Sequence, residues 1–273
     1  MTISQEDQND LLIAKKLLEN PGFAARIIHI LGRPVELGFQ KLPTSLSHQI
    51  SQISEKAIKS ALDVALKTMS TNPQKISSEK FHKLAIAATG GAGGAFGISA
   101  IAFELPISTT ILMRSIADIA RSEGENIMDI ETRLSCIEVF ALGGQSKKDD
   151  GMETGYFAIR AMLANAVSEA SGYILEKGVI DSSAPIILRF ISNIASRFGI
   201  VVSEKLALTA IPVVGAASGL LINTLFMDHF QDMARGHFII RRLERTYGKE
   251  KIKQLYQSIP EIIPVESNSE MTS

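Results

Sequence analysis

Apolar residues recur every three or four positions along most of the chain, which is the spacing of one face of an α-helix. The clearest case follows Leu42-Pro43, where Thr44 or Ser45 can cap a helix whose apolar face runs from Leu46 to Leu66. No run of alternating β-branched residues bounded by turns is visible. The pattern therefore predicts an all-α fold, a multi-helix globular bundle.

Turn signals divide the rest of the chain into further helices. The helices predicted from these signals are Ser4–Glu19, Phe23–Leu31, Ile107–Ser122, Asp129–Ala141, Met152–Lys177, Ile186–Ala210 and Lys249–Gln257. Proline lacks a backbone donor, so we expect a kink or a new helix at Pro106. The expected organisation is an N-terminal amphipathic helix in residues 1–30, a helical domain in 31–250, and a disordered tail in 258–273.

Two charge-free segments rich in glycine form the expected centre of this bundle. Leu84–Phe103 carries Gly90, Gly91, Gly93, Gly94 and Gly97, and Leu206–Met227 carries Gly215 and Gly219. Both contain the G-x-x-x-G spacing, which lets two helices approach closely in protein or in lipid. We expect these glycines to be helix-packing residues.

Both segments are also long enough to span a bilayer. The few Leu, Ile and Phe residues of Leu84–Phe103 contribute only roughly −2 to −4 kcal/mol toward insertion, and those of Leu206–Met227, with Val, roughly −3 to −6 kcal/mol. The first value is marginal, and the second is opposed by Pro212 and Asn223. A buried helix pair in a globular domain on a membrane is favoured over a membrane-inserted hairpin.

Composition excludes several classes of function. The formal net charge of −1 leaves no basic field, so we expect no nucleic-acid partner. The single cysteine, Cys136, rules out an intramolecular disulfide and fits a reducing compartment. The polar, acidic N-terminus does not resemble a signal peptide, so a cytoplasmic location is expected, with peripheral or integral attachment to the inner membrane left open. Phosphate-loop and hydrolase-elbow motifs are absent, and we expect no cofactor.

Charged and polar residues beside the apolar segments are the first candidates for a site. Glu104, Arg114, Lys205 and Asn223 interrupt or flank apolar runs. Ionised groups buried without partners cost several kcal/mol, so an internal ion pair of Glu104 with Arg114 or Lys205 is the simplest interpretation. Ligand-binding and catalytic sites use the same arrangement, so these residues are also candidates for a catalytic site.

A metal site is the weaker alternative. Asp228, His229, Asp232 and His237 follow the second apolar segment, and pairs of them share a helical face. Without a second cluster of ligands, a solvated or hydrogen-bonded helix face is favoured, and no metal is expected.

Several motifs of the chain resemble the EcsC family of bacterial proteins over roughly residues 30 to 250. The matching elements are Gly32-Arg33-Pro34-Val35-Glu36, the glycine run leading to Glu104-Leu105-Pro106, Arg114-Ser115-Ile116-Ala117-Asp118, and Ile211-Pro212-Val213-Val214-Gly215 continuing to Arg241. Glu104 stands where the family usually has aspartate. The resemblance adds Arg241 to the candidate site residues.

The resemblance implies a helical, membrane-associated accessory or regulatory protein, linked to processes that depend on an ABC transporter, with a membrane surface or membrane protein as partner. It brings no settled activity. Two alternatives remain open: a hydrolytic enzyme with its site around Glu104, Arg114, Lys205 and Asn223, and a secreted pore-forming or effector protein. The oligomeric state is left open.

Overall fold

The computed structural model describes residues 2–19, 23, 46–67, 97–144, 155–178, 181–209 and 215–260, and every regular element in these ranges is a helix. The helices are α1 (Gln5–Leu18), α4 (Ser47–Lys67), α6 (Gly97–Ser122), α7 (Ile130–Leu142), α8 (Gly155–Lys177), α9 (Pro185–Thr209), α10 (Gly215–Tyr247) and α11 (Lys249–Ser258). The all-α prediction is confirmed. The predicted helix Phe23–Leu31, apart from Phe23, and most of the predicted disordered tail lie outside the described residues.

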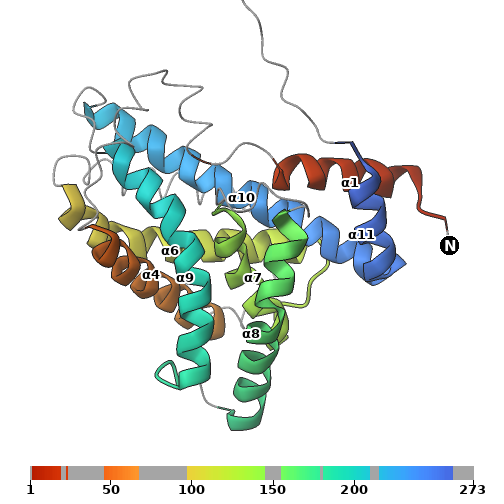
Figure 1. The fold of residues 1–273 in the computed structure, drawn as a ribbon, viewed down its shortest axis with the longest axis horizontal. Coiled ribbons are helices and arrows are strands. Elements are labelled where there is room, and N and C mark those ends of the chain that lie inside the picture. The colour runs from red at the N-terminus through yellow and green to blue at the C-terminus, as the bar shows by residue number, and fades with distance from the viewer. Residues whose placement is uncertain are drawn as a thin grey trace, which may run out of the picture.

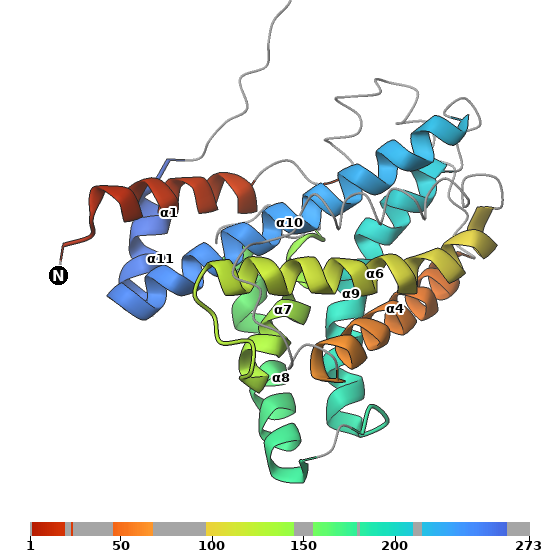
Figure 2. The ribbon, with the colours of Figure 1, turned by 180° about the vertical axis from the view of Figure 1, so that it is seen from behind.

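Helices α6 and α10 run across the molecule side by side, with α4 packed along the other side of α6 (Figure 2). Gln231 of α10 donates a hydrogen bond to Ser115 of α6, and Arg241 of α10 donates to Glu125, three residues past the end of α6. Both pairs are 116 positions apart, so α6 and α10 run in the same direction. Helices α8 and α9 extend away from this layer, and α7 lies between them and α10 (Figure 1). The two predicted glycine-bearing segments overlap α6 and α10 only in part, because residues 84–96 and 210–214 lie outside the described residues, so their pairing stays a prediction.

The core is densest where α7, α9 and α10 meet. Phe140, Phe198 and Phe230 contribute one ring from each helix, with centroids 5.3 to 5.6 Å apart. Helix α7 is buried on all sides from Thr132 to Leu142, as expected of a helix surrounded by others. Any charged residue in this buried stretch therefore needs a partner or a cavity.

The N-terminal helix α1 packs on the C-terminal half of α10. Ser4 caps it by accepting a hydrogen bond from the Asp7 amide at 3.1 Å. Lys15 is buried and donates to the Tyr256 carbonyl oxygen of α11 at 3.2 Å, while Arg242 of α10 pairs with Asp10 of α1. These contacts hold α1 against the helical domain.

The prediction of a break at Pro106 is wrong. Helix α6 continues through Pro106 from Gly97 to Ser122 instead of beginning at Ile107. Leu105, just before the proline, is fully buried, and Thr109 donates to its carbonyl oxygen at 2.6 Å. Packing of α6 between α4 and α10 therefore outweighs the local cost of proline in a helix interior.

The second predicted spanning segment, Leu206–Met227, does not form one helix. Its first residues end α9, and its last residues begin α10 at Gly215. Among the described residues, one helical stretch, Pro185–Leu208, is long and apolar enough to cross a bilayer, with mean hydropathy 1.5 and 44% of that window buried. Its phenylalanines, Phe190 and Phe198, are fully buried inside the protein. Core helices of soluble proteins can be equally long and apolar, so these two properties alone do not identify a membrane-spanning helix.

Candidate functional site

The structure brings two of the predicted site residues together. Lys205 of α9 donates to Glu104 of α6 at 2.7 Å, and its ammonium lies 4.6 Å from the centroid of the Phe226 ring. The Lys205 side chain is only 1% exposed, and burial lowers its pKa, against the opposing effect of Glu104. The pair matches the internal ion pair expected from the sequence. Lys205 is thus held by its partner and by an aromatic face.

Two of the other predicted site residues, Arg114 and Arg241, lie elsewhere. Arg114 is exposed and about 15 Å further along α6 than Glu104, at 1.5 Å per residue. Asn223 is buried on α10 about one helical turn before Phe226, the ring that lies against Lys205. Arg241 is roughly 27 Å further along α10 than Asn223. The five residues are therefore not one cluster, and a catalytic role for the four around Glu104 stays a prediction.

The predicted helix-packing glycines fall largely outside the described residues. Gly90, Gly91, Gly93 and Gly94 precede α6, whose first residue is Gly97. Gly215 and Gly219 lie in the first turns of α10, and their contacts are not among those that the structure describes. Their role in bringing α6 and α10 together stays a prediction.

The two histidines among the predicted metal ligands bind different protein groups. His229 lies 3.0 Å from the Gly143 carbonyl oxygen through Nε2, and His237 lies 3.0 Å from the Tyr156 hydroxyl through Nδ1. Asp228 and Asp232 are half-buried. In the part of the chain that the structure describes, no three His, Cys, Asp or Glu side chains come together in a way that could hold a metal ion.

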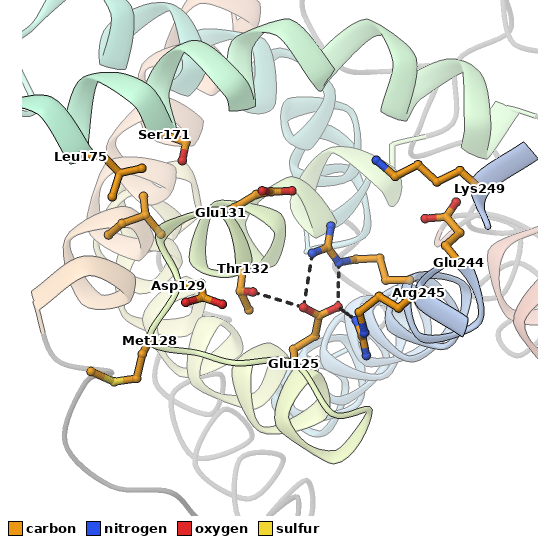
Figure 3. A pocket seen from close by; sticks show the side chains of 12 residues that line it. Glu125, Met128, Asp129, Glu131, Thr132, Ser171, Leu175, Glu244, Arg245 and Lys249 are labelled. Atoms are coloured by element: carbon orange, nitrogen blue, oxygen red, sulfur yellow. Dashed lines mark hydrogen bonds and ion pairs between the residues drawn. The ribbon is translucent and has the colours of Figure 1, made fainter. Parts of the chain in front are cut away.

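A charged cleft, which we call the α7–α8 cleft, lies between α7, α8 and the end of α10. It comprises two adjoining cavities of about 620 and 430 Å³ that share Glu131, Ser171, Arg241 and Lys249. Figure 3 shows Met128 and Leu175 on one side of the larger cavity, Lys249 and Glu244 on the other, and Glu125 between them. Arg241 is thus the one predicted site residue that lines the α7–α8 cleft.

Two sets of ion pairs form the walls of the cleft. Arg160 of α8 donates to both carboxylate oxygens of Glu244 at 2.8 and 3.0 Å, which ties α8 to α10. Arg241 donates to Glu125 at 2.8 Å, and Arg245 also pairs with Glu125. Both carboxylates are thus neutralised by arginines.

Glu138 of α7 is the exception among the acidic residues of the cleft. It lines the smaller cavity, its side chain is 5% exposed, and no described residue forms a hydrogen bond or ion pair with it. Burial raises the pKa of Glu138 to about 7, although Arg160 and Arg241 act in the opposite direction. A carboxyl group with such a pKa can gain or lose a proton near neutral pH.

Other reactive groups near the cleft are sealed in the core. Burial raises the pKa of the Cys136 thiol and of the Tyr156 hydroxyl, and lowers the pKa of His237 well below its ordinary value. All three side chains are almost fully buried. They act as packing and hydrogen-bonding groups.

The sequence analysis missed Glu138, Arg160 and Glu244. Glu138 is the only charged residue in the apolar stretch from Leu134 to Leu142. That is the same signal that singled out Arg114 within α6, and it could have identified Glu138. The pairing of Arg160 with Glu244 has no local signal, because the residues are 84 positions apart.

The described residues form a helical protein built around the parallel pair α6 and α10. Its charged cleft is lined by buried ion pairs, and no group of side chains that could hold a metal ion occurs among the described residues. The sequence model of the EcsC protein family matches residues 18–243, which is most of the chain. The chain therefore belongs to the EcsC protein family. No curated protein and no solved structure shows detectable similarity to it.

Proposed function

We propose that this EcsC family protein is a membrane-associated accessory protein that contacts the bilayer with the end of the molecule where α6 and α10 begin. The observation that carries the proposal is a pair of exposed apolar side chains on α6. Phe103 is 76% exposed and Ile107 is 54% exposed, and they lie one helical turn apart on the same face. Single exposed apolar residues are common, but a large neighbouring pair is a candidate contact surface.

A third exposed apolar residue supports the proposal that this end of the molecule contacts the bilayer. Leu220, near the start of α10, is also exposed. Gln231 bonds to Ser115 of α6, and Arg241 bonds to Glu125 just beyond the end of α6; both pairs are 116 positions apart, and the same separation carried back along the two helices places Leu220 level with Glu104. Both helices begin at the same end of the molecule in both views (Figures 1 and 2).

Peripheral contact fits the packing better than a spanning helix does. The polar face of α9 is engaged within the protein, since Arg197 donates to the Ala141 and Gly144 carbonyl oxygens and Ser192 donates to Glu55. Inserting α9 would break these contacts and expose the aromatic core. Contact through Phe103 and Ile107 requires no such rearrangement.

The expected strength follows from apolar burial. Fully burying a Phe or Ile side chain contributes about 1.5–3 kcal/mol, so the exposed parts of Phe103 and Ile107 together supply about 2–4 kcal/mol. Losing 2 kcal/mol weakens partitioning by more than about tenfold. An accessory role in transporter-dependent processes is the finer suggestion of family membership, and a membrane protein partner at this surface is its natural extension.

The test is sedimentation of the purified protein with vesicles of phosphatidylethanolamine and phosphatidylglycerol. The variant carries Phe103→Ser and Ile107→Ser, and the matched control is Leu188→Ser, which removes a side chain that is 48% exposed at the start of α9. We expect wild type and control to sediment with vesicles and the double variant to bind at least about tenfold more weakly. Equal partitioning of the double variant and wild type, or a wild type that stays in the supernatant, contradicts the proposal.

Fractionation of bacterial cells then separates peripheral from integral attachment. Peripheral attachment predicts release of the protein from membranes by carbonate. Retention through carbonate contradicts this mode of contact and returns the apolar segments to consideration as membrane-spanning elements.

A further inference from the structure

Glu138 is a buried carboxyl group for which the described protein supplies no partner. Its side chain is 95% shielded, yet no hydrogen bond or ion pair of a described residue reaches it, and it borders the smaller cavity of the α7–α8 cleft. Buried polar groups are nearly always paired, and an unpaired buried carboxylate is costly. A carboxyl group left open toward a cavity therefore points to a ligand that donates to it.

The remaining charges of the cleft fall into two groups. The Arg160–Glu244 pair and the salt bridges of Arg241 and Arg245 to Glu125 are internally matched. Three lining residues outside these pairs, Asp129, Glu131 and Lys249, are exposed and have no ion pair with any described residue. With Glu138, the cleft thus presents three carboxyl groups and one ammonium group that do not pair with one another, and Asp129 lines only the larger cavity.

Two of these carboxyl groups share one face of α7. Glu131 and Glu138 are two helical turns apart, about 10 Å along the axis, and Ser135 lies between them on that face. Ser168 and Ser171 line the same cavity from α8. This side of the cleft offers acceptors and hydroxyl groups suited to an ammonium group.

Two basic residues, Lys249 and Arg241, also line the cleft. Lys249 begins α11, and Arg241 uses Nε and Nη2 for Glu125, which leaves its Nη1 without a described partner. Both residues line both cavities. Arginine and lysine donors so placed are suited to a carboxylate or phosphate group.

We propose that the α7–α8 cleft binds a small organic zwitterion, with its ammonium group on Glu138 and its carboxylate or phosphate group on Lys249 and Arg241. A simple cation leaves Lys249 and Arg241 without an anionic partner from the ligand, and a simple anion leaves Glu138 without a donor. The volume of about 430 Å³ lies within the range of small-molecule sites. The cleft lies at the end of α10 away from Leu220, so this proposal does not depend on membrane contact.

The binding is expected to depend on pH through Glu138. The charged groups that act on it are Arg160 of α8, Arg241 and Glu244 of α10, and Glu131 of its own helix, and none from α4, α6 or α9 is among them. Its pKa of about 7 means that the carboxyl group is largely protonated in mild acid and largely ionised in mild base. Only the ionised form pairs with an ammonium group, so affinity rises from about pH 6 to about pH 8.

Three probes of matched length test the proposal by ligand-observed NMR: 5-aminopentanoate, pentylamine and pentanoate. The expected order of affinity is zwitterion, then amine, then acid, with tightening of the zwitterion by about tenfold over that pH range. Glu138→Gln is expected to weaken the zwitterion and the amine and to abolish the pH dependence. Glu176→Gln, which changes an exposed acid of α8 outside the cleft, is the matched control.

Lys249→Met supplies a second variant at an exposed position. It is expected to remove the preference for 5-aminopentanoate over pentylamine while leaving pentylamine binding intact. The proposal is overturned if none of the three probes binds, if pentanoate binds as well as the zwitterion, or if folded Glu138→Gln binds like wild type. Equal affinity of Glu138→Gln and wild type for the amine alone also overturns it.

Discussion

Replacing Glu104 with glutamine tests whether the Glu104–Lys205 pair is structural. The two charges are 2.7 Å apart, which at an effective dielectric constant of about 20 corresponds to an attraction of about 6 kcal/mol. Much of this offsets the cost of removing both charges from water. The variant leaves Lys205, which is almost fully buried, without its counter-ion. We expect Glu104→Gln to lower the free energy of unfolding by about 3–5 kcal/mol at neutral pH.

A double-mutant cycle isolates the pair from other effects. In Glu104→Gln/Lys205→Met, a neutral amide faces an apolar side chain that packs on the Phe226 ring. Replacing both ions of a buried pair is often nearly neutral, so the double variant should lie within about 1.5 kcal/mol of wild type. The coupling energy should then exceed about 2 kcal/mol.

The pH dependence adds a signature that a lost packing contact does not give. In Glu104→Gln the folded-state pKa of Lys205 lies below the ordinary value of 10.5, because burial lowers it and the carboxylate that raises it is gone. Between the folded and unfolded pKa values the unfolded chain binds more protons, so stability rises with pH. The deficit of Glu104→Gln relative to wild type should therefore shrink as the pH approaches 10.5.

Urea unfolding followed by far-ultraviolet circular dichroism is the suitable assay, because the chain has no tryptophan to report by fluorescence. A Glu104→Gln protein as stable as wild type at neutral pH refutes the structural role of the pair. Such a result combined with lost function in cells instead favours a catalytic or ligand-binding role for Glu104.

Three further predictions concern the cleft and the packing of helices. Glu138 holds its proton up to about pH 7 in the folded state but only to about pH 4.5 when unfolded. Between these two pH values the folded state binds more protons than the unfolded state. The free energy of unfolding therefore falls by about 3 kcal/mol as the pH rises from the lower value to the higher. Circular dichroism melts of Glu138→Gln should lose this slope, and an unchanged slope contradicts the assignment. Arg160→Met leaves the buried Glu244 carboxylate unpaired and should cost about 3–5 kcal/mol in urea unfolding, whereas a cost below about 1 kcal/mol argues against the pair. Gly236→Ala places a methyl group against the backbone and a leucine of α1, so it should lower the melting temperature. In the control Gly172→Ala the methyl group meets nothing within 4 Å, and the better helix propensity of alanine should raise stability by about 0.5–1 kcal/mol. Equal melting temperatures for the two variants contradict the packing of α1 on α10.

The sequence by itself determined the all-α class and many of the helix ends. Ser4 before α1, Asp129 before α7, Gly178 after α8 and Gly248 before α11 mark boundaries that depend on local backbone chemistry. The apolar period correctly placed the buried face of α4 on Ile50, Ala57, Ala61 and other residues of that stripe. Such features can be predicted because a helix, its ends and its apolar face involve residues a few positions apart.

Only the tertiary structure decided how those helices use their polar residues. Pro106 sits inside α6 because packing on two sides outweighs a local penalty. Arg114 and Glu104 share one helix, yet Arg114 faces solvent while Glu104 meets Lys205 of α9. Glu138 acquires its unusual pKa from burial among helices that are distant in sequence. Charges carry no signal of their partners along the chain, so the ion pairs and the α7–α8 cleft depend on the register in which the helices pack.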